Sequence, residues 1–413
     1  MPKSRIPTTL AGFGLALLGA CGAVVPPGNI EPVAQGGAYQ AQYREPPARV
    51  PDALLLVSAR MNAERCLTPL GGHLGDGPGS RLAKGAHLVT RSLMGEWLSR
   101  GDLVDIRVDS DETLSGSYVV SRDGTLKLPF LKPIPAQGRS AAQVEADLGR
   151  ALIEEGFYDA LPRLSVRMTD FASVSVGVKG AVFEPHAVEI GGTSGDRVDS
   201  ARQAALGSST EGRNLSVAIR AVGGVRPDAD LSAVKLTRAG RTHVLDLRDL
   251  FDGQTGEDIM LLTGDQIEVP SRGCFQDELM KPSPLSPPGI SLFLSNLTQP
   301  ASNNASSAIG REVREVPYGT RYIQAVVDAN CVGGARATSA NRSAILVSRN
   351  PISQVSTVIE RDIEPLLRRA DRDDYDPYLL PGDAVACYDS NVTNVAEAAR
   401  VLGIVGAAFL LNN

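Results

Sequence analysis

One short phrase occurs twice in this chain, as LLTGDQIEVP at residues 261–270 and as LLPGDAVACY at residues 379–388. Before each phrase comes a helical pattern that ends in Val-Gly-Gly, and then a strand pattern that ends in Arg238 or Arg349. The interval from Gly223 to Arg238 is 15 residues, and that from Gly333 to Arg349 is 16. The two stretches contain the same patterns in the same order, which predicts a tandem internal repeat of about 100 residues. The chain is therefore expected to form one small fold twice.

Glycine-aspartate pairs recur at the start of predicted strands. They are Gly101-Asp102, Gly264-Asp265 and Gly382-Asp383. Glycine tolerates the positive φ of a tight turn, and an aspartate carboxylate bonds nearby backbone amides. The alternative is a general base or a metal ligand, but none of the three pairs has a histidine beside it in sequence. We therefore interpret these aspartates as turn residues.

Glycine pairs end the two helical patterns of the repeat. They are Gly223 with Gly224, and Gly333 with Gly334. A helix C-terminus often needs a residue with positive φ, which glycine adopts without steric cost. These positions are expected to be structural.

Residues 91–172 predict a compact α+β unit. The alternation in LVDIRV indicates a half-buried strand, and Asp123-Gly124 lies between two short strand patterns, which is typical of a hairpin. Ser140 is a suitable N-cap for a helix that closes at Gly156, and a further strand, RLSVRM, follows.

An ordered set of motifs over about 75 residues carries a resemblance. The set comprises Gly101-Asp102-x-x-x-Ile106-x-Val108, Gly116-x-Tyr118-x-Val120, Asp123-Gly124, Leu128-Pro129, Gly138-x-Ser140 and Leu164-x-Val166. It resembles the polysaccharide export domain of outer-membrane capsule and exopolysaccharide translocons. The next stretch is similar to the opening strands of the family's soluble-ligand-binding β-grasp domains, although His186 stands where glycine is usual. The resemblance implies an α+β export domain followed by two tandem β-grasp-like domains and a C-terminal amphipathic transmembrane helix.

The N-terminus has the pattern of a secretory signal. Lys3 and Arg5 precede a short apolar run, and residues 18–21 read Leu-Gly-Ala-Cys, which resembles a bacterial lipobox with Cys21 as the lipidated residue. The alternative is an ordinary signal cleaved elsewhere. The Pro- and Gly-rich stretch to about residue 50 has no period and is interpreted as a tether.

Four further cysteines lie far apart in the sequence. They are Cys66, Cys274, Cys331 and Cys387. Their spacing does not fit a zinc site, and an oxidising periplasm would permit two disulfides in any of three connectivities. Cys387 lies in an apolar strand pattern, so a buried free thiol stays an alternative there.

The last 24 residues hold a candidate membrane helix. Residues 392–411 would span roughly 30 Å as a helix, with Thr393, Glu397 and Arg400 on one stripe. By resemblance such helices form an α-helical barrel through the outer membrane, with the polar stripe towards a water-filled lumen. The alternative is a helix packed on the last domain or lying on the membrane surface.

These patterns predict six segments: a signal peptide at 1–20, a lipidated tether and first strand region at 21–90, the export domain at 91–172, a first β-grasp domain at 173–272, a second, divergent one with a Pro-rich linker at 273–389, and the outer-membrane helix at 390–413. We call the fourth and fifth segments the first and second repeat. The net charge of -6 gives no attraction to nucleic acid. Because the sequence contains no nucleophile, cofactor or metal motif, we expect neither an enzyme nor a bound cofactor.

The sequence therefore predicts a lipid-anchored outer-membrane channel with its bulk in the periplasm. A homo-oligomeric ring and helical barrel would export a capsular or extracellular polysaccharide, and the resemblance implies an inner-membrane co-polymerase, often with a tyrosine kinase, as partner. The alternative is a periplasmic glycan-binding or scaffold lipoprotein without a pore.

Overall fold

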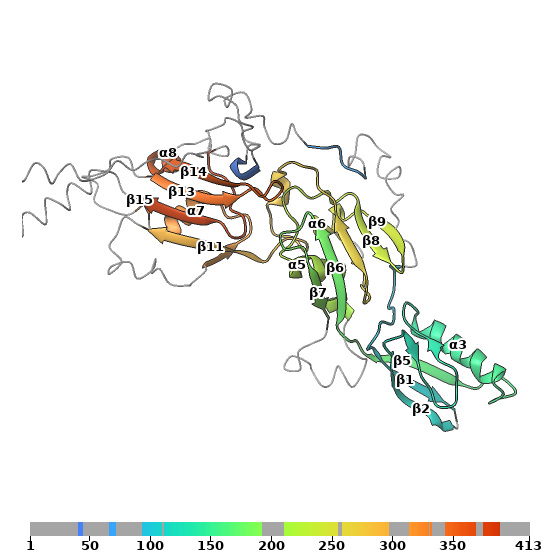
Figure 1. The fold of residues 1–413 in the computed structure, drawn as a ribbon. Coiled ribbons are helices and arrows are strands. Elements are labelled where there is room, and N and C mark those ends of the chain that lie inside the picture. Colours follow the sequence, from blue (N-terminus) through green and yellow to red (C-terminus); the bar gives the residue numbers. More distant parts are fainter. Residues whose placement is uncertain are drawn as a thin grey trace, which may run out of the picture. The chain divides into compact units, whose positions relative to one another are not determined.

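The computed structural model describes residues 40–43, 66–71, 93–109, 111–191, 210–254, 258–296, 314–329, 331–332, 343–368 and 375–388. The chain divides into two compact units (Figure 1). The central unit is Arg65–Pro288, and the terminal unit combines Met1–Glu64 with Gly289–Asn413.

The central unit begins with a three-stranded antiparallel sheet in the order β2-β1-β5. Its strands are β1 (Leu103–Val108), β2 (Asp111–Val119) and β5 (Leu164–Asp170). The alternation predicted for β1 is present, because Val104, Ile106 and Val108 are buried while the side chains between them are not. Helix α3 (Ala141–Glu154) packs against β5 (Figure 1).

Helix α3 begins and ends where its sequence predicts. The Ser140 side chain accepts a hydrogen bond from the Gln143 backbone, and the Gln143 side chain accepts one from the Ser140 backbone, which makes a capping box. Val144, Leu148 and Leu152 form the buried face, and Gly156 follows the helix with a φ of +79°.

The hairpin expected across Asp123-Gly124 is absent from the sheet pairing of the described residues. Strand β2 instead turns back on β1, and β3 (Thr125–Leu126) pairs with β4 (Ile134–Pro135). Gly124 has a φ of +81°, but Asp123 is not among the residues with positive φ, so the two-residue hairpin turn does not form. The Asp123 carboxylate accepts hydrogen bonds from the backbone and hydroxyl of Thr125, which holds a local turn.

The first repeat forms a five-stranded sheet in the order β7-β6-β10-β8-β9. The strands are β6 (Val174–Gly180), β7 (Ala187–Ile190), β8 (Val234–Arg238), β9 (Arg241–Leu245) and β10 (Gln266–Val269). The helical elements are α5 (Leu215–Ala221), α6 (Arg248–Phe251) and the short 3-10 helices η8 (Thr210–Arg213) and η9 (Asp277–Leu279). Helix η9 lies beyond the predicted boundary at residue 272, but Leu279 and Leu285 pack in the core of this sheet, so residues 273–288 are counted with the first repeat from here on. Strands β6 and β10 are parallel, and the other pairs are antiparallel.

The second repeat has the same topology in the terminal unit. Its sheet has the order β12-β11-β15-β13-β14, with β11 and β15 parallel. The strands are β11 (Gly289–Asn296), β12 (Arg314–Pro317), β13 (Ser343–Arg349), β14 (Ser356–Asp362) and β15 (Ala384–Tyr388), and the helices are α7 (Tyr322–Asp328) and α8 (Ile363–Arg368). Each strand of the first repeat thus has a counterpart in the second.

The strand register corrects one feature of the sequence alignment. Thr237 pairs with Gln266 in the first repeat, and Val347 pairs with Ala384 in the second. Gln266 and Ala384 are equivalent positions, because each follows its Gly-Asp turn directly. Their partners Thr237 and Val347 are therefore equivalent too, and the next residue along each strand is Arg238 in the first repeat and Ser348, not Arg349, in the second. A shift of one residue moves a side chain to the other face of a sheet, so the two strand-ending arginines are not equivalent.

The described residues form a mixed α+β fold with five α-helices and four sheets. None of the helices in these residues is long and apolar enough to cross a membrane. The expected C-terminal helix at residues 390–413, with Thr393, Glu397 and Arg400, lies outside the described residues.

Candidate functional site

The three Gly-Asp pairs form the same turn. In each, the aspartate carboxylate accepts a hydrogen bond from the backbone N–H three residues earlier, and the aspartate N–H donates to the carbonyl of that same residue. The bonds from backbone to carboxylate join Ser99 to Asp102, Leu262 to Asp265 and Leu380 to Asp383, at 2.6, 2.9 and 2.9 Å. Gly101, Gly264 and Gly382 have φ values of +89°, +94° and +83°. The turn therefore requires glycine at one position and a short acceptor side chain at the next.

The aspartate of the first turn joins two modules of the central unit. Asp102 lies 2.8 Å from Nη1 of Arg213, which comes from η8 of the first repeat, and both side chains are buried. The Asp102 carboxylate also accepts a hydrogen bond from the backbone of Ala172, and the Arg213 guanidinium lies over the Phe171 ring. This contact gives the buried carboxylate a cation and holds the β1 sheet to the first repeat.

The aspartate of the second turn is paired within the first repeat. Arg238, at the end of β8, donates from Nε and Nη2 to the Asp265 carboxylate, with a shortest distance of 2.6 Å. Its Nη2 also donates to the Met260 carbonyl. The charge of Asp265 is therefore neutralised by a two-pronged contact inside one sheet.

The aspartate of the third turn has only neutral partners among the described residues. Ser348 donates from its hydroxyl to Oδ1 of Asp383, and Gln42 donates from Nε2 to Oδ2 over 3.5 Å. Asp383 is 2 % exposed, and burial raises the pKa of its carboxyl to about 7, from an ordinary value of 3.8. The three hydrogen bonds that the carboxylate accepts only partly offset this burial.

Gln42 comes from a segment that the sequence analysis placed in the tether. Residues Ala41–Tyr43 form a buried 3-10 turn, η2, against the second repeat. Nε2 of Gln40 and of Gln42 both donate to the Tyr378 carbonyl at 2.8 Å, and the Tyr378 N–H donates to Oε1 of Gln40. No periodic pattern marks these residues, so the sequence offers no signal for this docking.

A second N-terminal segment, residues 66–71, docks on the first repeat. Leu70 donates its backbone N–H to the Asp230 carboxylate at 2.7 Å, and Gly71 donates to the Ser232 hydroxyl at 2.9 Å. A Cβ on Gly71 would lie 2.2 Å from the Ser232 carbonyl oxygen, so only glycine permits this approach. We call residues 66–71 the strap.

Two disulfides occur in the described part of the chain, one in each compact unit. Cys66 of the strap is bonded to Cys274, 208 residues away, and Cys331 is bonded to Cys387 on β15. Of the three connectivities open from the sequence, the structure contains this one. The alternative of a free thiol at Cys387 is wrong, because Cys331, three residues after the end of α7, is bonded to it on the central strand of the second repeat.

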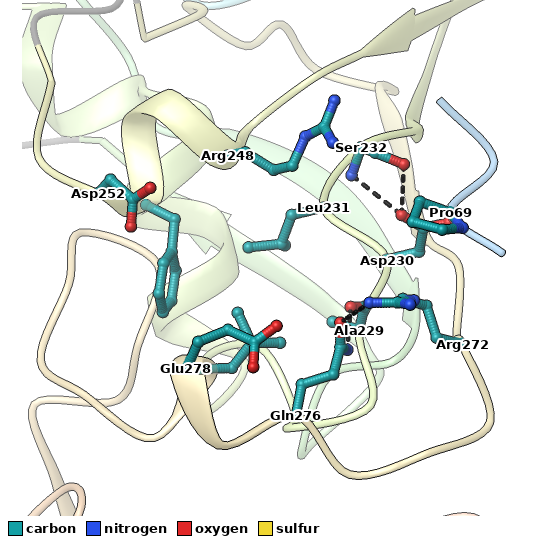
Figure 2. A pocket seen from close by; sticks show the side chains of 12 residues that line it. Pro69, Ala229, Asp230, Leu231, Ser232, Arg248, Asp252, Arg272, Gln276 and Glu278 are labelled. Atoms are coloured by element: carbon teal, nitrogen blue, oxygen red, sulfur yellow. Dashed lines mark hydrogen bonds between the residues drawn. The ribbon is translucent and has the colours of Figure 1, made fainter. Parts of the chain in front are cut away.

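A cavity of about 220 Å³ lies in the first repeat under the strap. Its apolar wall includes Leu231, Phe251 and Leu279, and Pro69 of the strap contributes to its edge. Figure 2 shows charged side chains arranged around Leu231; these are Arg248, Asp252, Glu278 and Arg272. The sequence gives no signal for the lining residues as a set, because they come from four separate segments, at 69, 229–232, 248–252 and 272–279.

The charged side chains of this cavity are held by neighbours. Arg248 is paired with Asp246 through a two-pronged contact, and Lys281 donates to Asp252 at 2.8 Å. Arg272 donates from Nη1 to Gln276 at 2.6 Å and from Nε to the Leu67 carbonyl of the strap at 3.0 Å. The cavity is thus a preformed polar ring over an apolar floor.

The remaining predicted residues have structural positions or lie outside the described part. Gly223 and Gly224 follow α5 with φ values of +80° and +77°, and a Cβ on Gly224 would also meet Pro287 at 2.5 Å. Cys21, Gly333 and Gly334 lie outside the described residues. In the residues that the structure does describe, no group of three His, Cys, Asp or Glu side chains could hold a metal ion.

The structure defines a class of protein: a small α+β module with a three-stranded sheet, followed by two copies of a five-stranded module with one topology. Residues 97–169, which include the first Gly-Asp turn and most of the three-stranded sheet, match the family of polysaccharide biosynthesis/export proteins. The resemblance stated from the sequence is confirmed over this segment, which links the chain to polysaccharide export. The chain matches no curated protein.

Proposed function

We propose that the protein is an outer-membrane export lipoprotein that forms a passive conduit for a capsular or extracellular polysaccharide. The observation that carries this proposal is the match of residues 97–169 to the polysaccharide biosynthesis/export family. In this proposal a homo-oligomeric ring surrounds the path of the polymer, and residues 390–413 of each subunit contribute one helix to the exit.

The contacts of the three turn aspartates support a passive role without catalysis. Each carboxylate accepts bonds from its own turn and from at least one further side chain, so each is used for structure. A general base needs an accessible carboxylate beside a proton to be moved. Asp102, Asp265 and Asp383 are at most 2 % exposed, which does not suit that role.

The docking of Gln40 and Gln42 supports an arrangement with the terminal unit next to the membrane. Only 18 residues separate Gln40 from Cys21, a length of at most about 65 Å when extended. At the other end, strand β15 of the second repeat ends at Tyr388, two residues before the start of the candidate membrane helix at 390–413. A lipid on Cys21 and a helix at 390–413 would both connect to the second repeat. We therefore propose that this repeat lies next to the outer membrane, and that an inner-membrane co-polymerase is a partner of the protein.

Truncation after Asp389 tests the conduit. We expect the shortened protein to keep its lipid anchor and its folded units but to leave the polysaccharide inside the cell, measured by surface staining of a deletion strain complemented with each form. Full-length protein is the matched control. Normal surface polysaccharide with the truncated form would overturn the conduit, and monomeric full-length particles in electron micrographs would overturn the ring.

A second candidate is a periplasmic glycan-binding or scaffold lipoprotein without a pore, which the cavity under the strap favours. In that case the truncated form restores surface polysaccharide, whereas variants of the cavity do not.

A further inference from the structure

We propose that the cavity of the first repeat, under the strap, binds one neutral sugar ring. The chemistry of the cavity carries this proposal, and the identification of the sugar as a unit of the exported polymer rests on the proposed function.

The size and floor of the cavity suit a single ring. Its volume of about 220 Å³ corresponds to roughly seven waters at about 30 Å³ each, which is room for one pyranose and too little for a folded oligosaccharide. The edges of Leu231, Phe251 and Leu279, residues that are 4 to 6 % exposed, supply a small apolar surface for the C–H face of such a ring. Nζ of Lys281 lies 5.2 Å from the centroid of the Phe251 ring, next to this surface. Binding sites of this kind combine an apolar surface with a few fixed polar groups.

The polar groups at the edge match hydroxyls, because a hydroxyl both donates and accepts. Asp252 and Glu278 present carboxylate acceptors, and the side chain of Asp252 is 45 % exposed. Arg272 uses Nε and Nη1 for the Leu67 carbonyl and Gln276, so its Nη2 remains to donate to a ligand within the described region. Donors and acceptors therefore face the cavity from different sides (Figure 2).

The charges select a neutral sugar over an acidic one. Three carboxylates line the cavity, from Asp230, Asp252 and Glu278, against the two guanidinium groups of Arg248 and Arg272. Two partners outside the lining set also count, because Asp246 pairs with Arg248 and Lys281 pairs with Asp252, so four carboxylates stand against three cations. The excess of negative charge disfavours a uronate or a phosphate, since like charges at close range repel.

The strap completes the cavity at Pro69 and is held there by the bond between Cys66 and Cys274. The hydrogen bonds of Leu70 to Asp230 and of Gly71 to Ser232 fix the same segment. The oxidised state should therefore be the binding state, and release of the strap should open the edge of the cavity.

The test uses the full-length protein in detergent and four probes: the methyl pyranosides of glucose, galactose and mannose, and glucuronate. We expect at least one neutral glycoside to bind with a Kd of about 1 mM and glucuronate to bind more weakly, measured by saturation-transfer NMR and calorimetry. Binding of no neutral glycoside, or preferential binding of glucuronate, would overturn the proposal.

Variants locate the binding. Asp252→Asn with Glu278→Gln should weaken the bound glycoside about tenfold to a hundredfold, because each loses a charged acceptor. Asp249→Asn, an exposed position on α6 outside the cavity, is the matched control and should bind like the parent. Equal binding by the double variant and the control would place the sugar elsewhere and contradict the proposal.

A strap variant gives an independent reading. Gly71→Ala should weaken binding, because its Cβ meets the Ser232 carbonyl, as should replacement of Cys66 and Cys274 by alanine. Unchanged hydrogen exchange at Ile267 on β10 shows that the first repeat still folds in these variants. If a glycoside binds but deletion of the protein leaves surface polysaccharide normal, the proposed function fails and the binding site remains. If no glycoside binds but deletion abolishes surface polysaccharide, the binding site is overturned and the proposed function remains.

Discussion

In the first repeat the aspartate that closes the Gly-Asp turn lies against Arg238, whereas in the second it lies against Ser348 and Gln42. The backbone is the same in both: the glycine has positive φ, the carboxylate accepts the N–H three residues back, and the leucine pair before the glycine is buried. What differs is the partner of the carboxylate, which is a cation in the first repeat and a pair of neutral donors in the second.

The difference shows that one turn can close a domain with or without a cation. In the first repeat the ion pair is internal to the sheet. In the second repeat the missing cation leaves a buried carboxyl with a raised pKa, and part of its hydrogen bonding comes from a segment 341 residues away. The N-terminal segment is thus connected to the turn that precedes the last described strand.

Removal of the cation in the first repeat should have the largest effect. Arg238→Met leaves Asp265 buried and unpaired, which should lower the free energy of unfolding of the central unit by about 3 to 5 kcal/mol. The matched change in the second repeat, Ser348→Ala, removes one neutral donor and should cost about 1 to 2 kcal/mol. Hydrogen exchange at Ile267 on β10 and Val385 on β15 measures the two repeats separately. Equal losses would contradict the comparison.

The second repeat should lose stability as the pH rises. The pKa of Asp383 is raised by burial to about 7 in the folded protein, above its ordinary value of 3.8, so the folded state binds more protons between these values. The proton on Asp383 therefore stabilises the folded state. This contribution, on the order of 4 kcal/mol at most, is fully present below about pH 4 and is lost as the pH rises through about 7. Urea unfolding followed by hydrogen exchange on β15 across this range measures the slope.

Asparagine substitutions sharpen that result. Asp383→Asn should remove this part of the pH dependence and stabilise the terminal unit at pH 8, because no buried charge remains. Asp265→Asn should destabilise the central unit at the same pH, since Arg238 then lacks its anion. The same sign for both variants would show that the two carboxylates are equivalent.

Replacement of the turn glycines should affect the two repeats equally. Gly264→Ala and Gly382→Ala each force a Cβ into a positive-φ position, at a cost of about 1 to 2 kcal/mol. Open space surrounds both positions, so no clash adds to that cost. Differential scanning calorimetry of both variants provides the measurement, and a clear inequality would mean that the backbones of the turns differ.

The smallest effect is expected for Gln42→Ala. The bond to Asp383 is long, at 3.5 Å, and the side chain also donates to the Tyr378 carbonyl at 2.8 Å and accepts from Nε2 of Gln40. Gln40 keeps its own bond to the Tyr378 carbonyl, so about 1 kcal/mol should be lost. The release of the segment is measured more clearly by proteolysis. Residues 40–43 should be cleaved faster in the variant, while strand β15 still resists cleavage. Full protection of the segment would show that Gln40 alone holds it.

Sequence reasoning predicted the elements whose signals are local. Ser140 and Gly156 mark the ends of α3, and the alternation of Val104, Ile106 and Val108 marks β1, as the structure has them. It failed where a local signal had two outcomes. Asp123-Gly124 makes a turn without a hairpin, and the alignment of Arg238 with Arg349 misses a register difference of one residue.

The amino-acid sequence alone determined the repeat, the turns and the family of residues 97–169, because each depends on residues close together in the chain. Backbone preferences act over a few residues, so they can be read in order. The partners of the turn aspartates were settled by folding. Arg213 lies 111 residues from Asp102, and Gln42 lies 341 residues from Asp383. A buried carboxylate takes whichever donor the packing of distant segments brings to it, and that choice is a property of the folded chain.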